Sequence, residues 1–154
     1  SIKLVTKTPD RPSRVQNVSG ACMLVRRDAF EKLNGFDTRF FLYYEEIDFC
    51  MRATQKGYKV YYNPDIEVRH FIAKSSSENR ESFFFNLYYN KLLFIKKHFS
   101  YPFYLTGYLL IIIGILLRIF VSSIAGLVTY RKHLLRLSKS LIFVLIKIIK
   151  NRYR

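Results

Sequence analysis

One stretch of the chain, residues 103–130, is apolar over a length that can cross a lipid bilayer. A spanning helix needs about 20 consecutive apolar residues, and Arg118 is the single charged residue in this stretch. A charge near the centre of such a helix costs roughly 2.5–3.5 kcal/mol on insertion scales, which apolar flanks can offset. The sequence therefore predicts a membrane-associated helical region over residues 101–154. A full span and a re-entrant or interfacial hairpin are both compatible with it.

Charge is distributed unevenly along the chain, whose formal net charge is +15. Residues 1–70 hold 12 Lys and Arg against 9 Asp and Glu (+3), whereas residues 71–154 hold 14 against 2 (+12). Residues 134–150 interleave basic residues with Leu and Ile, a pattern typical of a basic amphipathic helix in the headgroup layer. A partner-binding or bundle helix is the alternative. This interleaving disfavours nucleic acid as the partner and indicates an anionic membrane surface.

Shorter signals for strands and helices precede the apolar stretch and indicate an α/β domain over residues 1–100, with too few strands for a complete sheet. The expected elements are an extended segment over 15–26, a short helix capped by Asp28 and Glu31 and ended by Asn34–Gly35, a helix over 45–56 ended by Gly57, strands over 58–62 and 66–70, and a helix over 82–97.

Three carboxylates, Glu45, Glu46 and Asp48, fall in the first turn of the helix predicted over residues 45–56. The helix dipole favours negative charge at this end and is expected to keep the pKa values of these groups low. At helical spacing Glu45, Asp48 and Arg52 share one face. Two interpretations stay open at this point, a solvated helix N-terminus and a group of catalytic carboxylates.

A series of short motifs occurs in a fixed order over residues 15–100. They are Gly20–Ala21, Asn34–Gly35–Phe36–Asp37, the run from Phe40 to Arg52, Gly57–Tyr58, Pro64, Val68–Arg69–His70 and the run from Tyr88 to Phe94. The series resembles the acceptor-side half of the family 2 glycosyltransferases of the GT-A fold, especially their bacterial rhamnosyltransferase-like branch. The resemblance implies an α/β, partial GT-A (Rossmann-like) domain that lacks its N-terminal nucleotide-binding half and is followed by apolar and amphipathic helices.

The resemblance also implies a reaction. Members of the family transfer a sugar from a nucleotide diphosphate donor to an acceptor hydroxyl with inversion, which requires a carboxylate as general base. The family places this base in a Glu-Asp pair that corresponds to Glu45–Glu46, so Glu46 is the expected base. Glu in place of Asp moves the carboxylate about one methylene further out, and the backbone or acceptor must shift to suit it. Asp48 is expected to orient Arg52 or a sugar hydroxyl, with a helix-surface ion pair to Arg52 as the alternative.

Further site residues follow from the same resemblance. It implies a divalent metal, Mn²⁺ or Mg²⁺, near the donor diphosphate, with His70 as a ligand. A hydrogen-bonded structural histidine is the alternative for His70. Gly20 and Ala21 would let the acceptor approach the backbone closely, and Asp37 and Arg52 are the other expected substrate contacts.

The donor-binding motifs of the family do not occur in the chain, which has neither an Asp-x-Asp motif nor a Gly-rich phosphate loop. We therefore expect the nucleotide sugar to be held by a segment before residue 1 or by a separate chain, and the 154 residues alone to be inactive. Two functions fit these patterns. One is the acceptor-side half and anchor of a glycosyltransferase that acts on a lipid-linked or polysaccharide acceptor at the cytoplasmic face of the cell membrane. The other is a non-catalytic basic membrane-binding or scaffold module.

Overall fold

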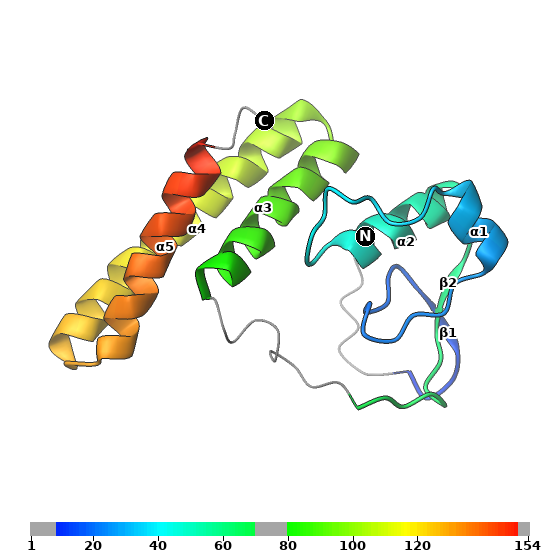
Figure 1. Ribbon diagram of the computed structural model, residues 1–154, viewed down its shortest axis with the longest axis horizontal. Helices are drawn as coiled ribbons and strands as arrows, with labels where there is room; N and C mark the ends of the chain where they lie inside the picture. Colours follow the sequence, from blue (N-terminus) through cyan, green and yellow to red (C-terminus); the bar gives the residue numbers. More distant parts are fainter. Residues whose placement is uncertain (1–8, 70–79, 151–154) are drawn as a thin grey trace. The chain divides into compact units, whose positions relative to one another are not determined.

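The computed structural model describes residues 9–69 and 80–150 (Figure 1). The chain divides into two compact units, Ser1–Phe71 and Ile72–Arg154. Its elements are β1 (Ser13–Val15), α1 (Arg27–Lys32), α2 (Glu45–Gln55), β2 (Val60–Tyr62), α3 (Arg80–His98), α4 (Tyr101–Val128) and α5 (Lys132–Lys150). The boundary predicted from the sequence, at residue 100, falls between α3 and α4, whereas α3 packs with α4 and α5 in the second unit.

The first unit contains one small sheet. Its strands β1 and β2 pair antiparallel, with Ser13 opposite Tyr62 and Val15 opposite Val60. Within residues 9–69 and 80–150 these three-residue strands are the whole of the sheet, and the rest of the regular structure is helical. The partial Rossmann-like sheet implied by the resemblance is therefore not confirmed, because such a sheet needs parallel strands joined by crossovers.

Two predicted extended segments are mostly wrong. Of the segment predicted over residues 15–26, only Val15 belongs to a strand. Gly20–Ala21 lies in a turn, where the Ala21 N–H donates to the Ser19 hydroxyl at 3.3 Å. In the second, residues 66–69 form no strand. The chain turns away after β2, and the Asp65 N–H donates to the Asn63 side chain at 3.2 Å. An alternating pattern becomes a strand only where a neighbouring strand pairs with its backbone.

Helix α1 ends where the sequence predicts but begins differently. Asn34 and Gly35 have φ values of 56° and 63°, which belong to the left-handed region that Gly and Asn adopt most readily. The predicted cap is wrong, because Asp28 already lies inside the helix and no side chain caps its first turn. Asp28 instead binds Arg26 at 2.9 Å. A guanidinium competes well with a backbone N–H for a carboxylate.

Packing of α2 against α1 forms the core of the first unit. Phe30, Phe36 and Phe49 contact one another with ring centroids 5.3–5.7 Å apart. Phe49 is 2% exposed. The remaining members of this core are Leu33 and Ala53, with Met23, Val25 and Tyr58 packed against them. This core fixes the direction of α2 and therefore the place of its first turn.

The second unit consists of α3, α4 and α5, which follow one another through short connections (Figure 1). Its core residues are Leu92, Tyr108, Ile111, Ile115, Leu141, Val144 and Ile148. Helix α4 is the one described helix long and apolar enough to cross a membrane. At 1.5 Å per residue its 28 residues extend about 42 Å, more than the roughly 30 Å hydrocarbon core of a bilayer. A hairpin within residues 101–128 is excluded, because the helix is continuous there.

Helices α4 and α5 approach closely along a row of small residues. The hydroxyls of Ser122 and Ser138 lie 2.7 Å apart, and a Cβ built on Gly126 would lie 2.8 Å from Leu135 Cδ2. Small and hydroxyl-bearing residues allow such an approach and are typical of helix pairs in membranes. One face of α5 is covered by α3 and α4. Residues 134–150 therefore form a helix of a three-helix bundle, which is the alternative to a helix lying in the headgroup layer.

Candidate active site

The candidate site is the first turn of α2, which begins at Glu45 and ends within one residue of the predicted boundary. Tyr43 and Tyr44 precede it with φ values of 71° and 74°. Left-handed backbone is unfavourable for bulky residues and gathers at functional sites in proteins. The Tyr44 carbonyl accepts the Asp48 N–H at 2.8 Å. The side chain of Tyr44, the residue before the helix, makes no capping hydrogen bond.

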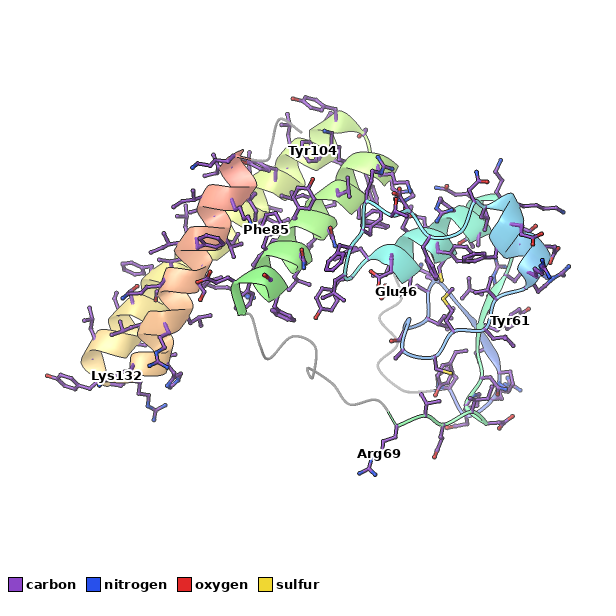
Figure 2. All side chains as sticks on the ribbon, in the orientation of Figure 1. Glu46, Tyr61, Arg69, Phe85, Tyr104 and Lys132 are labelled. Atoms are coloured by element: carbon purple, nitrogen blue, oxygen red, sulfur yellow. The ribbon has the colours of Figure 1, made fainter. Side chains whose placement is uncertain are left out.

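Glu46 lies against the turn that contains Gly20. A Cβ built on Gly20 would be 3.6 Å from Glu46 Cβ and 4.0 Å from its Cδ. One carboxylate oxygen of Glu46, Oε2, is buried and has no hydrogen-bond partner within the described part of the chain, and the same holds for Oε2 of Glu45. Buried polar atoms are nearly always satisfied. Each of these two oxygens could therefore accept a hydrogen bond from the O–H or N–H of a bound molecule (Figure 2 labels Glu46).

The environment of Glu46 changes its acidity. Burial raises the pKa of the Glu46 carboxyl, and the charge of Glu45 adds to the increase, against a backbone hydrogen bond that lowers it. The low pKa expected for Glu46 is thus wrong, because burial disfavours its charged form more than the backbone hydrogen bond favours it. Burial and the charge of Glu46 also raise the pKa of Tyr44. A carboxylate with a raised pKa is a stronger base, which suits proton abstraction.

Asp48 and Arg52 form a buried ion pair. Arg52 Nε donates to Asp48 Oδ2 at 2.7 Å, and the Asp48 side chain is 0% exposed. The other guanidinium nitrogens donate to the carbonyls of Leu33 and Gly35 at 2.6 and 2.7 Å. The predicted i, i+4 pair is therefore present, but it is buried rather than on the helix surface. It joins α2 to the residues that end α1.

The remaining predicted site residues are less closely associated with the acids. Asp37 binds Arg39, with Oδ2 2.6 Å from Nη2, and its side chain is 14% exposed. Ala21 lies in the exposed turn beside Gly20. His70, the expected metal ligand, lies outside the described residues. In the parts that are described, no three His, Cys, Asp or Glu side chains come close enough together to hold a metal ion.

Two features of the site are not evident in the sequence. Positive φ at Tyr43 and Tyr44 has no sequence signal, since neither residue is Gly, Asn or Asp. The reach of Arg52 to the carbonyls of Leu33 and Gly35 depends on how α1 and α2 pack. The Asn34–Gly35 pair is the one available hint, because carbonyls at a helix C-terminus need donors.

Comparison with known proteins identifies the family of the chain. A family model described as Glycosyl transferase family group 2 matches residues 6–147, and the chain belongs to this family of glycosyltransferases. The rhamnosyltransferase-like resemblance is confirmed by relatives. The chain is 42% identical to N-acetylglucosaminyl-diphospho-decaprenol L-rhamnosyltransferase of Mycobacterium tuberculosis over 65 residues, which are 42% of this chain and 21% of that protein.

Two more relatives agree with this assignment. Rhamnosyltransferase WbbL of Escherichia coli K12 is 39% identical over 65 residues, 42% of this chain and 24% of that protein. Low-salt glycan biosynthesis hexosyltransferase Agl10 of Haloferax volcanii is 33% identical over 63 residues, 39% of this chain and 20% of that protein. The matched region thus spans between 20% and 24% of these curated relatives. No solved structure matches the chain significantly.

Proposed function

We propose that the chain is the acceptor-side part of an inverting glycosyltransferase that moves a sugar from a nucleotide diphosphate donor to a lipid-linked saccharide. Its similarity to a rhamnosyltransferase for N-acetylglucosaminyl-diphospho-decaprenol supports this substrate class. Nucleotide-activated L-rhamnose is accordingly the first donor to test. The nucleotide is held by another segment or by a separate chain, since the donor-binding motifs do not occur in these 154 residues.

Glu46 is the general base in this proposal. Its carboxylate takes the proton of the acceptor hydroxyl while the hydroxyl oxygen forms a bond to the anomeric carbon of the sugar. The bond from that carbon to the diphosphate oxygen breaks, and the nucleotide diphosphate leaves with the electron pair. The observation that carries the proposal is the buried Oε2 of Glu46, without a partner in the described chain and beside Gly20. A hydroxyl at this point would satisfy that oxygen.

The neighbouring residues have supporting roles. The charge of Glu45 raises the pKa of Glu46, and the Gly20–Ala21 turn leaves room for the acceptor. Asp48 and Arg52 act as positioning residues, because their hydrogen bonds are made within the protein. Arg52 donates to Asp48, Leu33 and Gly35 and is therefore not assigned a contact with the substrate. Asp37, paired with Arg39, shapes the loop that leads to α2.

Metal and membrane complete the proposal. Glu45 and Glu46 offer two buried oxygens, and no third His, Cys, Asp or Glu side chain among the described residues completes a metal site with them. No step above therefore passes through Mn²⁺ or Mg²⁺, although some members of the family use such ions. Helix α4 supports attachment to the membrane, and we place the enzyme at the cytoplasmic face, where nucleotide sugars are available.

A chimera tests the assignment of Glu46. Residues of this chain replace the matching segment of Rhamnosyltransferase WbbL, and transfer of L-rhamnose to the lipid-linked acceptor is measured in membranes. We expect Glu46→Gln to reduce the rate by about 10²–10⁴-fold, the usual range for a lost general base. Glu31→Gln is the matched control, because Glu31 lies on the surface in an ion pair with Arg27. An active Glu46→Gln chimera would exclude Glu46 as the base, whereas a wild-type chimera that folds but transfers no sugar would favour the non-catalytic membrane module.

A further inference from the structure

Two cations of the second unit, Arg118 and Lys147, have aromatic partners in positions where acidic partners are usual. Glu81 is the one acid in residues 80–150. Arg118 Nη1 donates to the Tyr88 hydroxyl at 3.0 Å. Lys147 Nζ lies 4.6 Å from the ring centroid of Phe85, which Figure 2 labels on α3. Phenol and phenyl groups orient a cation without neutralising it, so the unit keeps its positive charge for an anion from outside.

Arg118 holds that charge within an apolar surface. It is exposed on α4, ten residues before Val128, which places it about 15 Å along the helix from that end. Its neighbours Leu117 and Val121 are 58% and 61% exposed. A guanidinium stays charged at any ordinary pH and has five donors, which bind phosphate in a forked geometry. An anion would remove much of the unfavourable energy of a charge in apolar surroundings.

The surface one turn before Arg118 is open. A Cβ built on Gly114 would meet no atom within 4 Å. Gly126, on the same helix, is the opposite case, since it is covered by Leu135. Residues four apart lie on one helix face, so the open backbone at Gly114 and the guanidinium of Arg118 are neighbours along α4. An extended hydrocarbon chain fits against such a surface, with its charged end at Arg118.

We propose that Arg118, oriented by Tyr88, binds the phosphate of an anionic lipid whose hydrocarbon chain lies along α4 beside Gly114. The inference rests on the proposed membrane association of α3–α5 and is independent of the transfer reaction. The phosphate that Arg118 binds belongs either to a lipid or to a small anion in solution. A substitution at Gly114 distinguishes these two ligands. A free phosphate needs Arg118 alone, whereas a lipid also needs the open surface.

Binding of dioleoyl phosphatidic acid to the full 154-residue chain in neutral detergent tests the site, with inorganic diphosphate as the soluble competitor. We expect Arg118→Leu to weaken lipid binding about tenfold or more, as for a lost hydrogen-bonded charge pair. Arg118→Lys should retain part of the affinity, because the charge stays while the forked geometry is lost. Tyr88→Phe should weaken binding less than Arg118→Leu does. Arg136→Leu removes an exposed cation from α5 and is the matched control, expected to bind normally.

Gly114→Leu identifies the source of the phosphate. It should weaken binding of phosphatidic acid and leave binding of inorganic diphosphate unchanged. Equal losses in Arg118→Leu and Arg136→Leu would overturn the proposal in favour of unspecific charge attraction. Full binding of phosphatidic acid by Gly114→Leu, with ready displacement by inorganic diphosphate, would overturn it in favour of a soluble phosphate. Sedimentation with phosphatidylcholine vesicles is measured in parallel, so that loss of the phosphate site is distinguished from loss of membrane attachment.

Discussion

Gly20 lies beside Glu46, close enough for a Cβ at position 20 to touch it, although one belongs to a turn after β1 and the other to the first turn of α2. The position that a Cβ of residue 20 would occupy is 4.0 Å from Glu46 Cδ, an ordinary van der Waals distance. An alanine therefore fits at position 20, whereas a longer side chain enters the space beside the carboxylate. The acceptor hydroxyl needs that same space in the proposed reaction.

This proximity predicts opposite results for two substitutions at position 20. Gly20→Ala should transfer sugar at close to the wild-type rate. Gly20→Leu should be slower by about 10²-fold, the order expected when reacting groups are displaced by 1 Å. The WbbL chimera provides the rate, and thermal unfolding of each variant shows whether the fold is intact. A Gly20→Leu chimera that folds and transfers at the wild-type rate would contradict the placement of the acceptor.

The raised pKa of Glu46 predicts a gain of stability when the charge is removed. Burial raises this pKa above its ordinary value of 4.5, so the fold favours the protonated form. The stability from this group is fully present below its unfolded pKa and is lost as pH rises through the folded pKa. Glu46→Gln stays neutral throughout. We expect this variant to have a higher urea midpoint than wild type at pH 7. Near pH 3.5 the two should differ little, because the wild-type Glu46 carboxyl is then mostly protonated in both the folded and the unfolded state.

The raised pKa of Glu46 also affects how the rate of sugar transfer depends on pH. The ionised form of Glu46 is the base, so the acid limb of the pH–rate profile should lie at higher pH than an ordinary glutamate would give. Glu31→Gln serves as control for both measurements, because Glu31 is a surface residue. Equal urea midpoints for Glu46→Gln and wild type at pH 7 would show that burial does not oppose ionisation of Glu46.

The Asp48–Arg52 pair predicts a large loss of stability on removal of one partner. Arg52→Leu leaves the fully buried Asp48 carboxylate without its guanidinium and removes the donors to the carbonyls of Leu33 and Gly35. Breaking a buried ion pair in this way costs about 3–5 kcal/mol. Arg27→Leu breaks the exposed Arg27–Glu31 pair instead and should cost about 1 kcal/mol or less.

Urea unfolding of both variants measures the difference. The double variant Asp48→Leu with Arg52→Leu should be more stable than Arg52→Leu alone, because it removes the buried charge together with its partner. If Arg52→Leu unfolds at the same urea concentration as Arg27→Leu, Arg52 does not hold α2 against α1. Arg52 would then be available as a substrate contact, the role expected from the family resemblance.

The helices of this chain follow from local sequence patterns, and the strands do not. The limits of α2 and the end of α1 depend on capping residues such as Gly57, Asn34 and Gly35, which act through their own backbone angles. The segments predicted over residues 15–26 and 66–70 depend on partner strands. Only residues 13–15 and 60–62 find them in the described structure. Pairing is a property of the whole sheet, so the alternating pattern predicted more strand than forms.

The sequence is sufficient to propose the acids of α2 as a site, but it does not predict their environment. The acids of α2 are recognisable in the sequence because they belong to an ordered series of motifs. The full burial of Asp48 and the raised pKa of Glu46, which burial causes, depend on how the chain packs around α2. A helical pattern places Asp48 and Arg52 on one face, and it does not say that this face turns inward.

Membrane attachment of the second unit is the final prediction. Side chains along α4 expose a broad apolar surface that includes Leu110, Phe120 and Leu127, each at least 64% exposed. Burial of such surface in lipid does not depend on salt, whereas attraction of basic residues to an anionic surface, about 1 kcal/mol for each, is screened by it. The full chain should therefore sediment with vesicles of phosphatidylglycerol and phosphatidylcholine and stay bound in high salt and in alkaline carbonate.

Two segments separate the contributions of burial and charge. Residues 101–130, which contain α4, should stay in the pellet at high salt. Residues 131–154, which contain the basic α5, should be released, because on their own they bind largely through charge. Deletion of residues 103–150 should leave the rest of the chain, the first unit together with α3, in the supernatant. Release of the full chain by carbonate would show that α4 is not inserted. Its apolar surface would then cover a protein partner, and the anchor role of the second unit would be wrong.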